Sequence, residues 1–298
     1  MTHKAGYVTI IGFPNTGKST LLNALAAEKL AIISPKAQTT RHRIKAFVNG
    51  ENYQIIFSDT PGILIPKYKL QQAMLKSIRE SLEDADVILL ITEPVQIINQ
   101  ELLPEQIRGG KIPVIILINK IDISTQKKVE EAYELWNKLI PFATIMPVSA
   151  LLRINLKNLL DKIIDLLPES PPYFPKDELT EHPERFFVSE MIREQILLQF
   201  HEEIPYSCEV TIESFKEMPE LIHITAVIFV MRESQKAILL GHHGKAIRKL
   251  GSAARKEIES FIRRHIFLQL RVKVEPEWRE NERSLRRFGY TLSPPEEV

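Results

Sequence analysis

The chain has 298 residues, 44% of them apolar and 26% charged, with a formal net charge of +1. This composition is typical of a soluble globular protein, and the length is sufficient for two domains. A single cysteine, Cys208, excludes an intramolecular disulfide and favours a cytosolic compartment. No run reaches the roughly 18 apolar residues of a membrane-spanning helix. We therefore expect a cytoplasmic protein that is at most peripherally associated with a membrane.

The first apolar run, residues 7–11, leads into a glycine-rich stretch with the pattern G-x-x-x-x-G-K-S. A strand, a glycine loop and a helix in this order surround a phosphate chain with backbone N–H donors, and the helix N-terminus adds positive charge. Lys18 would reach the outer phosphates, and the Ser19 hydroxyl would bind Mg²⁺. The candidate phosphate-binding residues are Gly12, Asn15, Thr16, Gly17, Lys18, Ser19 and Thr20.

Apolar strands alternate with helices through the next part of the chain. The patterns predict strands over 43–48, 53–57, 87–91, 113–118 and 144–148, and helices over 68–82, 127–139 and 155–167. A weaker helix over 99–108 is interrupted by Pro104. This alternation predicts an α/β domain with a mixed, mostly parallel sheet covered by helices on both faces. The polar motifs follow strands, where such sheets bind ligands.

One motif after the glycine loop supplies further magnesium and phosphate ligands. Asp59, in Asp-Thr-Pro-Gly, would hold Mg²⁺ through a water, and the Gly62 N–H would meet the γ-phosphate. A second hydroxyl on Mg²⁺ would come from the polar loop 33–43, where we choose Thr40 over Thr39. A loop that is ordered only by the γ-phosphate acts as a switch.

Two later motifs predict the base that is recognised. The carboxylate of Asp122, in Asn-Lys-Ile-Asp, would accept from the ring N–H and the exocyclic amine of guanine, a donor pair that adenine lacks. The remaining candidates at the base are Asn119, Lys120, Ser149 and Ala150. The motifs together favour GTP and GDP as ligands.

In this order, the motifs resemble those of the translation-factor-related GTPases, which implies their fold and GTP hydrolysis for the first domain. Ile63 stands where Ras-like enzymes have a water-orienting glutamine, so we expect slow unaided hydrolysis. The resemblance implies that Asn15 helps to hold K⁺ near the phosphates; a hydrogen bond that braces the loop is the alternative. The candidate catalytic residues are Lys18, Thr40, Asp59, Gly62 and Asn15.

A proline-rich stretch separates two patterns of elements. Residues 168–183 contain five prolines, and we interpret 173–183 as a linker between a domain at 1–172 and a second domain at 184–298. The second domain has the predicted order α-β-β-α-α-β, a smaller α+β arrangement that matches a type II KH domain. Cys208 falls in an apolar alternation and is expected in its core.

The loop Gly-His-His-Gly in the second domain predicts an RNA site. A G-x-x-G loop between helices lets the backbone clamp about four nucleotides of a single strand. From 241 to 290 there are 13 Lys and Arg against 6 Asp and Glu. The candidate RNA-binding residues are Ile238, Leu239, Gly241, His242, His243, Gly244, Lys245, Ile247, Arg248 and Lys249.

Over nearly its whole length the chain resembles the Era family of GTPases, including Gln-Thr-Thr-Arg-His-Arg at 38–43. The resemblance implies binding to ribosomal RNA of the small subunit near its 3′ end, a role in small-subunit assembly, and some peripheral membrane association; DNA is not expected. The His-His pair departs from the family pattern, in which a lysine follows the first glycine. The basic stretch 278–287 would either extend the RNA surface or form a helical lid.

Two other functions remain open from the sequence. One is a constitutive RNA-binding assembly factor in which the nucleotide only braces the fold. The other is a regulatory GTPase whose basic face meets a membrane surface.

Overall fold

The computed structural model describes residues 2–95 and 100–292, and the chain divides into two compact units. The first comprises residues 1–31, 40–67 and 74–181, and the second comprises 32–39, 68–73 and 182–298. Each unit is described separately below.

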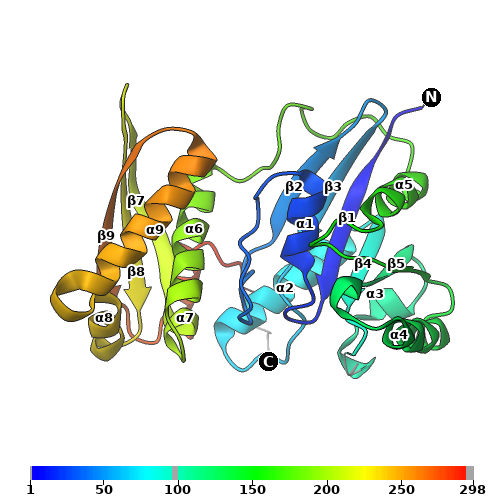
Figure 1. Cartoon of the computed structure of the whole chain (residues 1–298), viewed down its shortest axis with the longest axis horizontal. Coiled ribbons are helices and arrows are strands. Elements are labelled where there is room, and N and C mark those ends of the chain that lie inside the picture. The colour runs from blue at the N-terminus through cyan, green and yellow to red at the C-terminus, as the bar shows by residue number, and fades with distance from the viewer. Residues whose placement is uncertain (1, 96–99, 293–298) are drawn as a thin grey trace. The chain divides into compact units, whose positions relative to one another are not determined.

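The first unit contains a six-stranded sheet (Figure 1). Its strands are β1 (Lys4–Gly12), β2 (Ile44–Asn49), β3 (Tyr53–Asp59), β4 (Val87–Thr92), β5 (Val114–Ile118) and β6 (Thr144–Pro147). Their order is β2-β3-β1-β4-β5-β6, with β2 antiparallel to β3 and all other pairs parallel. The expected mixed, mostly parallel sheet is confirmed. Because β1, β4 and β5 are parallel neighbours, the segments that follow them emerge at the same edge.

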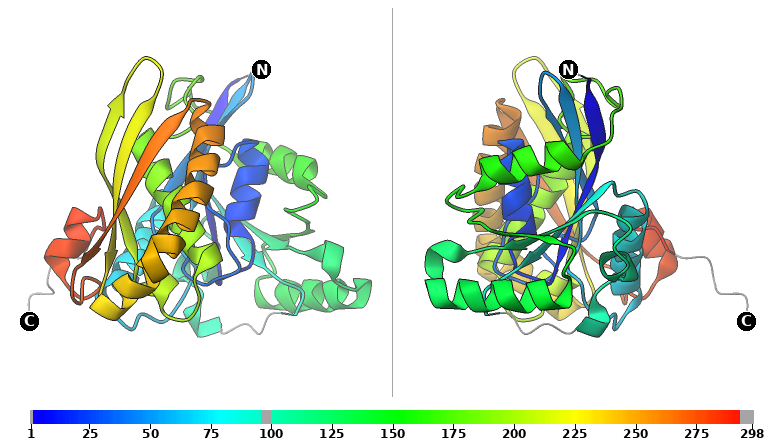
Figure 2. Two further views of the ribbon diagram at one scale, coloured as in Figure 1. Left: turned by 60° about the vertical axis from the view of Figure 1, so that its left-hand side comes forward. Right: turned by 90° about the vertical axis from the view of Figure 1, so that its right-hand side faces the viewer.

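Helices flank this sheet. They are α1 (Lys18–Ala26), α2 (Lys69–Glu83), α3 (Glu105–Arg108), α4 (Gln126–Leu139) and α5 (Leu156–Leu166), with short 3₁₀ turns η1 (Gln100–Leu102) and η2 (Ile121–Ile123). Leu82, Ile107 and Trp136 bring α2, α3 and α4 into one buried cluster with β4 and β5. Figure 2 shows α1, in blue, beside α5, in green. Pro104 separates η1 from α3, as the sequence predicts.

The proline-rich stretch packs against the first sheet up to residue 181. Phe47 N donates to Leu179 O at 2.8 Å, and Phe174 stacks on Phe47 with ring centroids 4.2 Å apart. The Gln54 side chain donates to Phe174 O at 2.8 Å. Composition indicated a linker here, but these contacts attach most of the stretch to β2 and β3.

The second unit contains a three-stranded sheet. Its elements are α6 (Glu184–Gln199), α7 (Ile204–Ser207), β7 (Glu209–Glu217), β8 (Ile222–Val230), α8 (Glu233–Leu240), η3 (His242–Gly244), α9 (Lys245–Ile262), β9 (Ile266–Val274) and α10 (Glu282–Arg287). The predicted order α-β-β-α-α-β is confirmed, with α7 and α10 added. β8 pairs antiparallel with β7 and parallel with β9, and α6 and α9 pack on the sheet (Figure 1).

Buried side chains fix the C-terminal part of this unit. Cys208 lies in the core, as expected. Trp278 Nε1 donates to Ser207 O at 2.9 Å, and the Tyr290 hydroxyl donates to Glu209 Oε2 at 2.8 Å. These contacts anchor the segments on either side of α10 to the unit. Within 2–95 and 100–292, no helix is both long enough and apolar enough to cross a bilayer.

Two segments from the N-terminal part of the chain belong to the second unit. In the first, residues 32–39, Ile33 N donates to Glu194 Oε1 at 2.9 Å and Thr39 O accepts from the Arg193 guanidinium. In the second, residues 68–73, Leu70 N donates to Arg279 O at 3.0 Å. Both segments therefore depend on α6 or on the stretch before α10 for their conformation.

Candidate functional site

The glycine loop connects β1 to α1 in the first unit. Gly17 has a φ of 99°, and a Cβ there would lie 2.4 Å from Asn119 Nδ2, so only glycine fits. Lys18 is buried, and its Nζ donates to Gly12 O at 3.1 Å and to Phe13 O at 2.9 Å. The ammonium group is thereby held inside the loop that the sequence predicts to bind phosphates.

Three oxygen-bearing side chains meet at the end of this loop. Ser19 Oγ lies 2.7 Å from Asp59 Oδ2 and 2.8 Å from Thr40 Oγ1, and Thr40 Oγ1 lies 3.3 Å from the same Asp59 oxygen. Thr39 Oγ1 instead donates to Lys36 O at 2.6 Å. The geometry therefore brings Thr40, and not Thr39, to the expected magnesium ligands.

The donor set fits a divalent cation. Asp59 Oδ1 is buried and has no hydrogen-bond partner within the described part of the chain. A buried carboxylate oxygen without a partner costs free energy unless water or a cation binds it. Hydroxyl and carboxylate oxygens are also the ligands that Mg²⁺ prefers. The residues present therefore match the group that the sequence motifs require.

Burial sets the electrostatics of this cluster. It raises the pKa of Asp59 to about 6, against the lowering effects of the Ser19 hydrogen bond and the Lys18 charge. Burial likewise lowers the pKa of Lys18 to about 8, against the raising effect of Asp59. Burial therefore makes the Lys18 ammonium and the Asp59 carboxylate less favourable here than in water. A bound polyphosphate with its cation would stabilise both charged groups.

Asn119 joins the glycine loop to the loop after β6. Its Nδ2 donates to Thr16 O at 2.8 Å, and its Oδ1 accepts from Ala150 N at 3.0 Å. Lys120 Nζ donates to Asn15 O at 2.7 Å and pairs with Glu93 at 2.6 Å. Asn119 thus fixes the distance between the phosphate loop and the predicted base loop.

The other predicted base residues lie on neighbouring loops. Asp122 is partly exposed in η2, and Ser149 is buried, with its Oγ accepting from Leu152 N at 3.1 Å. Glu93 was not among the sequence candidates. It matches no motif, and only the position of β4 beside β5 brings it to Lys120.

Gly62 and Asn15 have contrasting surroundings. A Cβ on Gly62 would lie 3.0 Å from Pro14, so its backbone runs close to the glycine loop. The next residue, Ile63, donates its N–H to Gly12 O at 3.0 Å, and its side chain is buried in the core. Asn15 is exposed with a φ of 66°, and it is its carbonyl oxygen that accepts from Lys120.

The first unit therefore gathers most of the predicted nucleotide residues around one glycine loop. The residues that lie close to one another there are Gly12, Asn15, Thr16, Gly17, Lys18, Ser19, Thr40, Asp59, Gly62, Asn119, Lys120 and Ala150. Thr20 lies in the first turn of α1, with its side chain partly exposed.

The second candidate site is the loop between α8 and α9. Gly241 and Gly244 have φ values of 67° and 72°, and His243 is also left-handed at 51°. A Cβ on Gly241 would lie 2.6 Å from Ala246 Cβ, so the loop requires glycine there. Arg248 Nε donates to Gly244 O at 3.2 Å and closes the loop from α9.

The side chains around this loop are mainly exposed, with one correction to the sequence prediction. Ile238 is 49% exposed, but Leu239 is 0% exposed because it faces the core on the inner side of α8. Leu239 therefore does not belong to an apolar floor for bases; Leu240, at 36%, is exposed instead. The exposed polar residues are His242, His243, Lys245, Arg248 and Lys249, and Ile247 is partly exposed.

Family models match both parts of the chain. A family model described as a 50S ribosome-binding GTPase matches residues 7–120, and one described as a KH domain matches residues 203–279. The GTPase Era of Caldanaerobacter subterraneus is 42% identical over 98% of this chain and 99% of its own length.

Two solved structures are also similar over nearly the whole chain. An Era variant from Aquifex aeolicus bound to GDP·AlF4⁻ matches with a TM-score of 0.93 and 41% identity, over 97% of this chain and 100% of that chain. Era in complex with MgGDPNP and nucleotides 1506–1542 of 16S ribosomal RNA matches with the same TM-score, identity and coverage. With a P-loop GTPase fold followed by a KH domain, and with this similarity over both, the chain belongs to the GTPase Era family.

Proposed function

We propose that the protein is a GTP-hydrolysing switch that binds small-subunit ribosomal RNA near its 3′ end and assists small-subunit assembly in the cytoplasm. The observation that carries this proposal is the relative bound to MgGDPNP and 16S RNA, because its likeness extends over both units. The magnesium ligands of the first unit and the glycine loop of the second supply the matching chemistry.

In this proposal the phosphates of GTP lie in the glycine loop, with Lys18 beside them and Mg²⁺ held by Ser19, Thr40 and, through a water, Asp59. When bound, Mg²⁺ would neutralise charge on the phosphates and favour their transfer to water. Asp122 would select guanine. The binding energy would offset the cost of keeping Lys18 and Asp59 charged in a buried site.

Hydrolysis is expected to be slow without a partner. The Ile63 side chain is apolar and buried, so it does not orient an attacking water. Asn15 is exposed on the loop, which supports the proposal that it helps to hold K⁺ near the phosphates. Replacing K⁺ by Na⁺ in a hydrolysis assay tests this: equal rates in both salts would contradict it.

The segment before Thr40 supports coupling of nucleotide and RNA. Residues 32–39 are held by α6, through Glu194 and Arg193, and the predicted magnesium ligand Thr40 follows directly. A γ-phosphate that orders Thr40 would therefore act on a segment attached to the KH unit. We expect a GTP analogue to raise RNA affinity relative to GDP.

The test is RNA affinity measured with GDP and with a non-hydrolysable GTP analogue, using an RNA that ends in the small-subunit 3′ sequence. Gly241→Asp should abolish binding, but it also strains the loop, because Gly241 has a positive φ. Lys249→Glu tests the same surface without backbone strain and should also weaken RNA binding, since Lys249 is exposed on regular helix. Equal affinity with both nucleotides would contradict the switch, and absence of binding would contradict the RNA ligand.

Lys18→Ala separates the switch from a constitutive RNA-binding factor. In a switch, the variant should lose the nucleotide effect on RNA affinity, because it no longer holds the phosphates. In a constitutive factor, RNA affinity should stay that of the unaltered protein in every nucleotide state.

Membrane association remains a prediction of the family resemblance. Liposome flotation with anionic lipid, in the presence and absence of competing RNA, tests it.

A further inference from the structure

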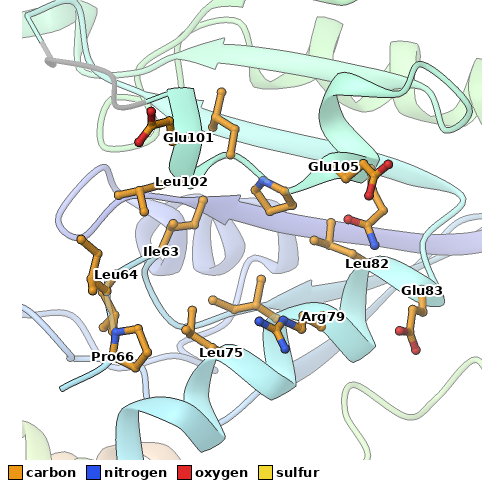
Figure 3. A pocket seen from close by; sticks show the side chains of 15 residues that line it. Ile63, Leu64, Pro66, Leu75, Arg79, Leu82, Glu83, Glu101, Leu102 and Glu105 are labelled. Atoms are coloured by element: carbon orange, nitrogen blue, oxygen red, sulfur yellow. The ribbon is translucent and has the colours of Figure 1, made fainter. Parts of the chain in front are cut away.

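A groove of about 440 Å³ lies within the first unit, outside the nucleotide ligands (Figure 3). Its walls are the segment 63–66, one side of α2, and the segment 101–106 that contains η1 and α3. This volume is within the roughly 300–1,000 Å³ of typical ligand pockets. The nucleotide motifs do not use it.

The floor and walls of the groove are mainly apolar. Figure 3 shows Leu64, Leu75 and Leu102 at one end of the groove and the buried Leu82 toward the other, near Glu83 and Glu105. Ile65, which also lines the groove, is 64% exposed and adds to the apolar surface there. The groove therefore suits aliphatic or aromatic side chains of a binding partner.

The rim carries an excess of negative charge. Glu83, Glu101 and Glu105 line the groove, against one positive residue, Arg79, and all four are exposed. Carboxylates around an apolar groove attract cationic partners and disfavour acidic ones. This charge distribution distinguishes the groove from the basic surface around the loop 241–244.

One wall is directly joined to the nucleotide site. Ile63 follows Gly62, whose N–H is expected to meet the γ-phosphate, and Ile63 N is fixed to Gly12 O at 3.0 Å. A displacement of Gly62 on hydrolysis would move Ile63 and the wall that begins there.

We propose that this groove binds a short apolar segment of a partner protein that carries Lys or Arg at one end, and that it does so preferentially when GTP is bound. The apolar residues enter between α2 and η1, and the basic residue pairs with the acidic rim. The nucleotide preference rests on the proposed GTP switch; the groove and its charge preference do not.

The probe is a phage-displayed library of random peptides of about twelve residues, of which a few neighbouring side chains can enter the groove. It is selected on the full chain loaded with a non-hydrolysable GTP analogue and counter-selected on Leu102→Asp. Enriched peptides should combine apolar residues with Lys or Arg. A synthetic representative should bind the full chain at least about tenfold more tightly than Leu102→Asp, a difference of about 1.4 kcal/mol.

Charge reversal makes the test specific. Glu83→Lys should lower the affinity for the basic peptide at least about tenfold. Changing the Lys or Arg of the peptide to Glu should restore its affinity for this variant. Glu83 ends α2, where a positive side chain is compatible with the helix dipole. Enrichment without basic residues, equal binding to Leu102→Asp, or no enrichment would overturn the proposal.

Each variant must keep its GDP affinity and RNA affinity, which shows that it is folded. Equal peptide affinity with GDP and with the analogue would overturn only the nucleotide preference. Because RNA binding is read separately, failure of the groove is distinguishable from failure of the proposed function.

Discussion

The guanidinium of Arg193, in α6, donates a hydrogen bond to the backbone carbonyl of Thr39, the residue directly before the predicted magnesium ligand Thr40. Arg193 also forms an ion pair with Glu190, one turn earlier in α6, and both side chains are almost fully buried. A buried cation therefore holds the segment in which the sequence predicts a switch.

Breaking this ion pair should destabilise the protein strongly. Arg193→Met leaves the Glu190 carboxylate buried without its partner, and we expect a loss of about 3–5 kcal/mol in the free energy of unfolding. Glu190→Gln combined with Arg193→Met should recover a large part of that loss, because neither charge of the pair remains. Urea unfolding of both single variants and the double variant measures the coupling. Additive losses would contradict a coupled pair.

The pH dependence of the nucleotide-free protein should reflect Asp59. The pKa of Asp59 in the folded state is raised from 3.8 to about 6, so the folded state binds the proton more tightly than the unfolded state. The free energy of unfolding therefore falls as pH rises from about 4 to about 6. At neutral pH the full destabilisation by the ionised, buried Asp59 is present.

Asp59→Asn should remove this cost. We expect the variant, free of nucleotide and magnesium, to gain on the order of 3 kcal/mol at about pH 7.5 and nearly nothing at about pH 4. Its affinity for magnesium-bound nucleotide should fall at the same time. Unfolding at the two pH values measures the gain, with Asp84→Asn as the exposed control. A stability loss at pH 7.5 would contradict the assignment.

Asn119→Ala should lower the affinity of the protein for GDP and for a GTP analogue equally. The change leaves Thr16 O and Ala150 N without their partner, at a cost of about 1–3 kcal/mol for each buried group. Since these atoms position the phosphate and base loops, GDP and the GTP analogue should lose affinity together. Titration with a fluorescent guanine nucleotide measures this, with Asn52→Ala as the exposed control. A loss confined to the GTP analogue would show that Asn119 belongs to the switch instead.

Restoring the glutamine of Ras-like enzymes should not accelerate hydrolysis. The Ile63 side chain packs with Ile78 and Leu82, so Ile63→Gln buries an amide in the core. We expect the free energy of unfolding to fall by about 1–3 kcal/mol and the single-turnover rate of GTP hydrolysis to stay unchanged. A rate increase of about tenfold or more, which is about 1.4 kcal/mol in the barrier, would show that this side chain reaches the water.

The sequence predicts the parts of the structure that short motifs or periodicity determine. Asn119 and Gly17 belong to motifs at strand ends, and parallel neighbours bring such ends together. Which side of a short helix faces the core is harder to predict. The helix α8 has eight residues, and its apolar pattern does not distinguish buried Leu239 from exposed Leu240. The contact of Arg193 with Thr39 joins positions 154 residues apart and has no local signal.

Composition also does not reveal that the stretch 168–181 packs against β2 and β3. Prolines indicate that regular helix and strand are absent, but they do not indicate whether the backbone is solvated or packed. Gln54 donates a hydrogen bond to Phe174 O, and Phe47 N donates one to Leu179 O. Nothing in the sequence of the stretch identifies these two partners.

The assignment of residues 32–39 and 68–73 to the second unit has a practical consequence for dissecting this protein. A fragment that starts at His182 would lack the chain that covers Arg193 and Glu194, and it would expose a buried ion pair to water. Conversely, a fragment that ends at Glu181 would keep the loop 32–39 and the start of α2 without the residues of the second unit that they contact. The compact unit that holds the KH portion therefore includes residues from the N-terminal part of the sequence, and a truncation between 181 and 182 separates them from it.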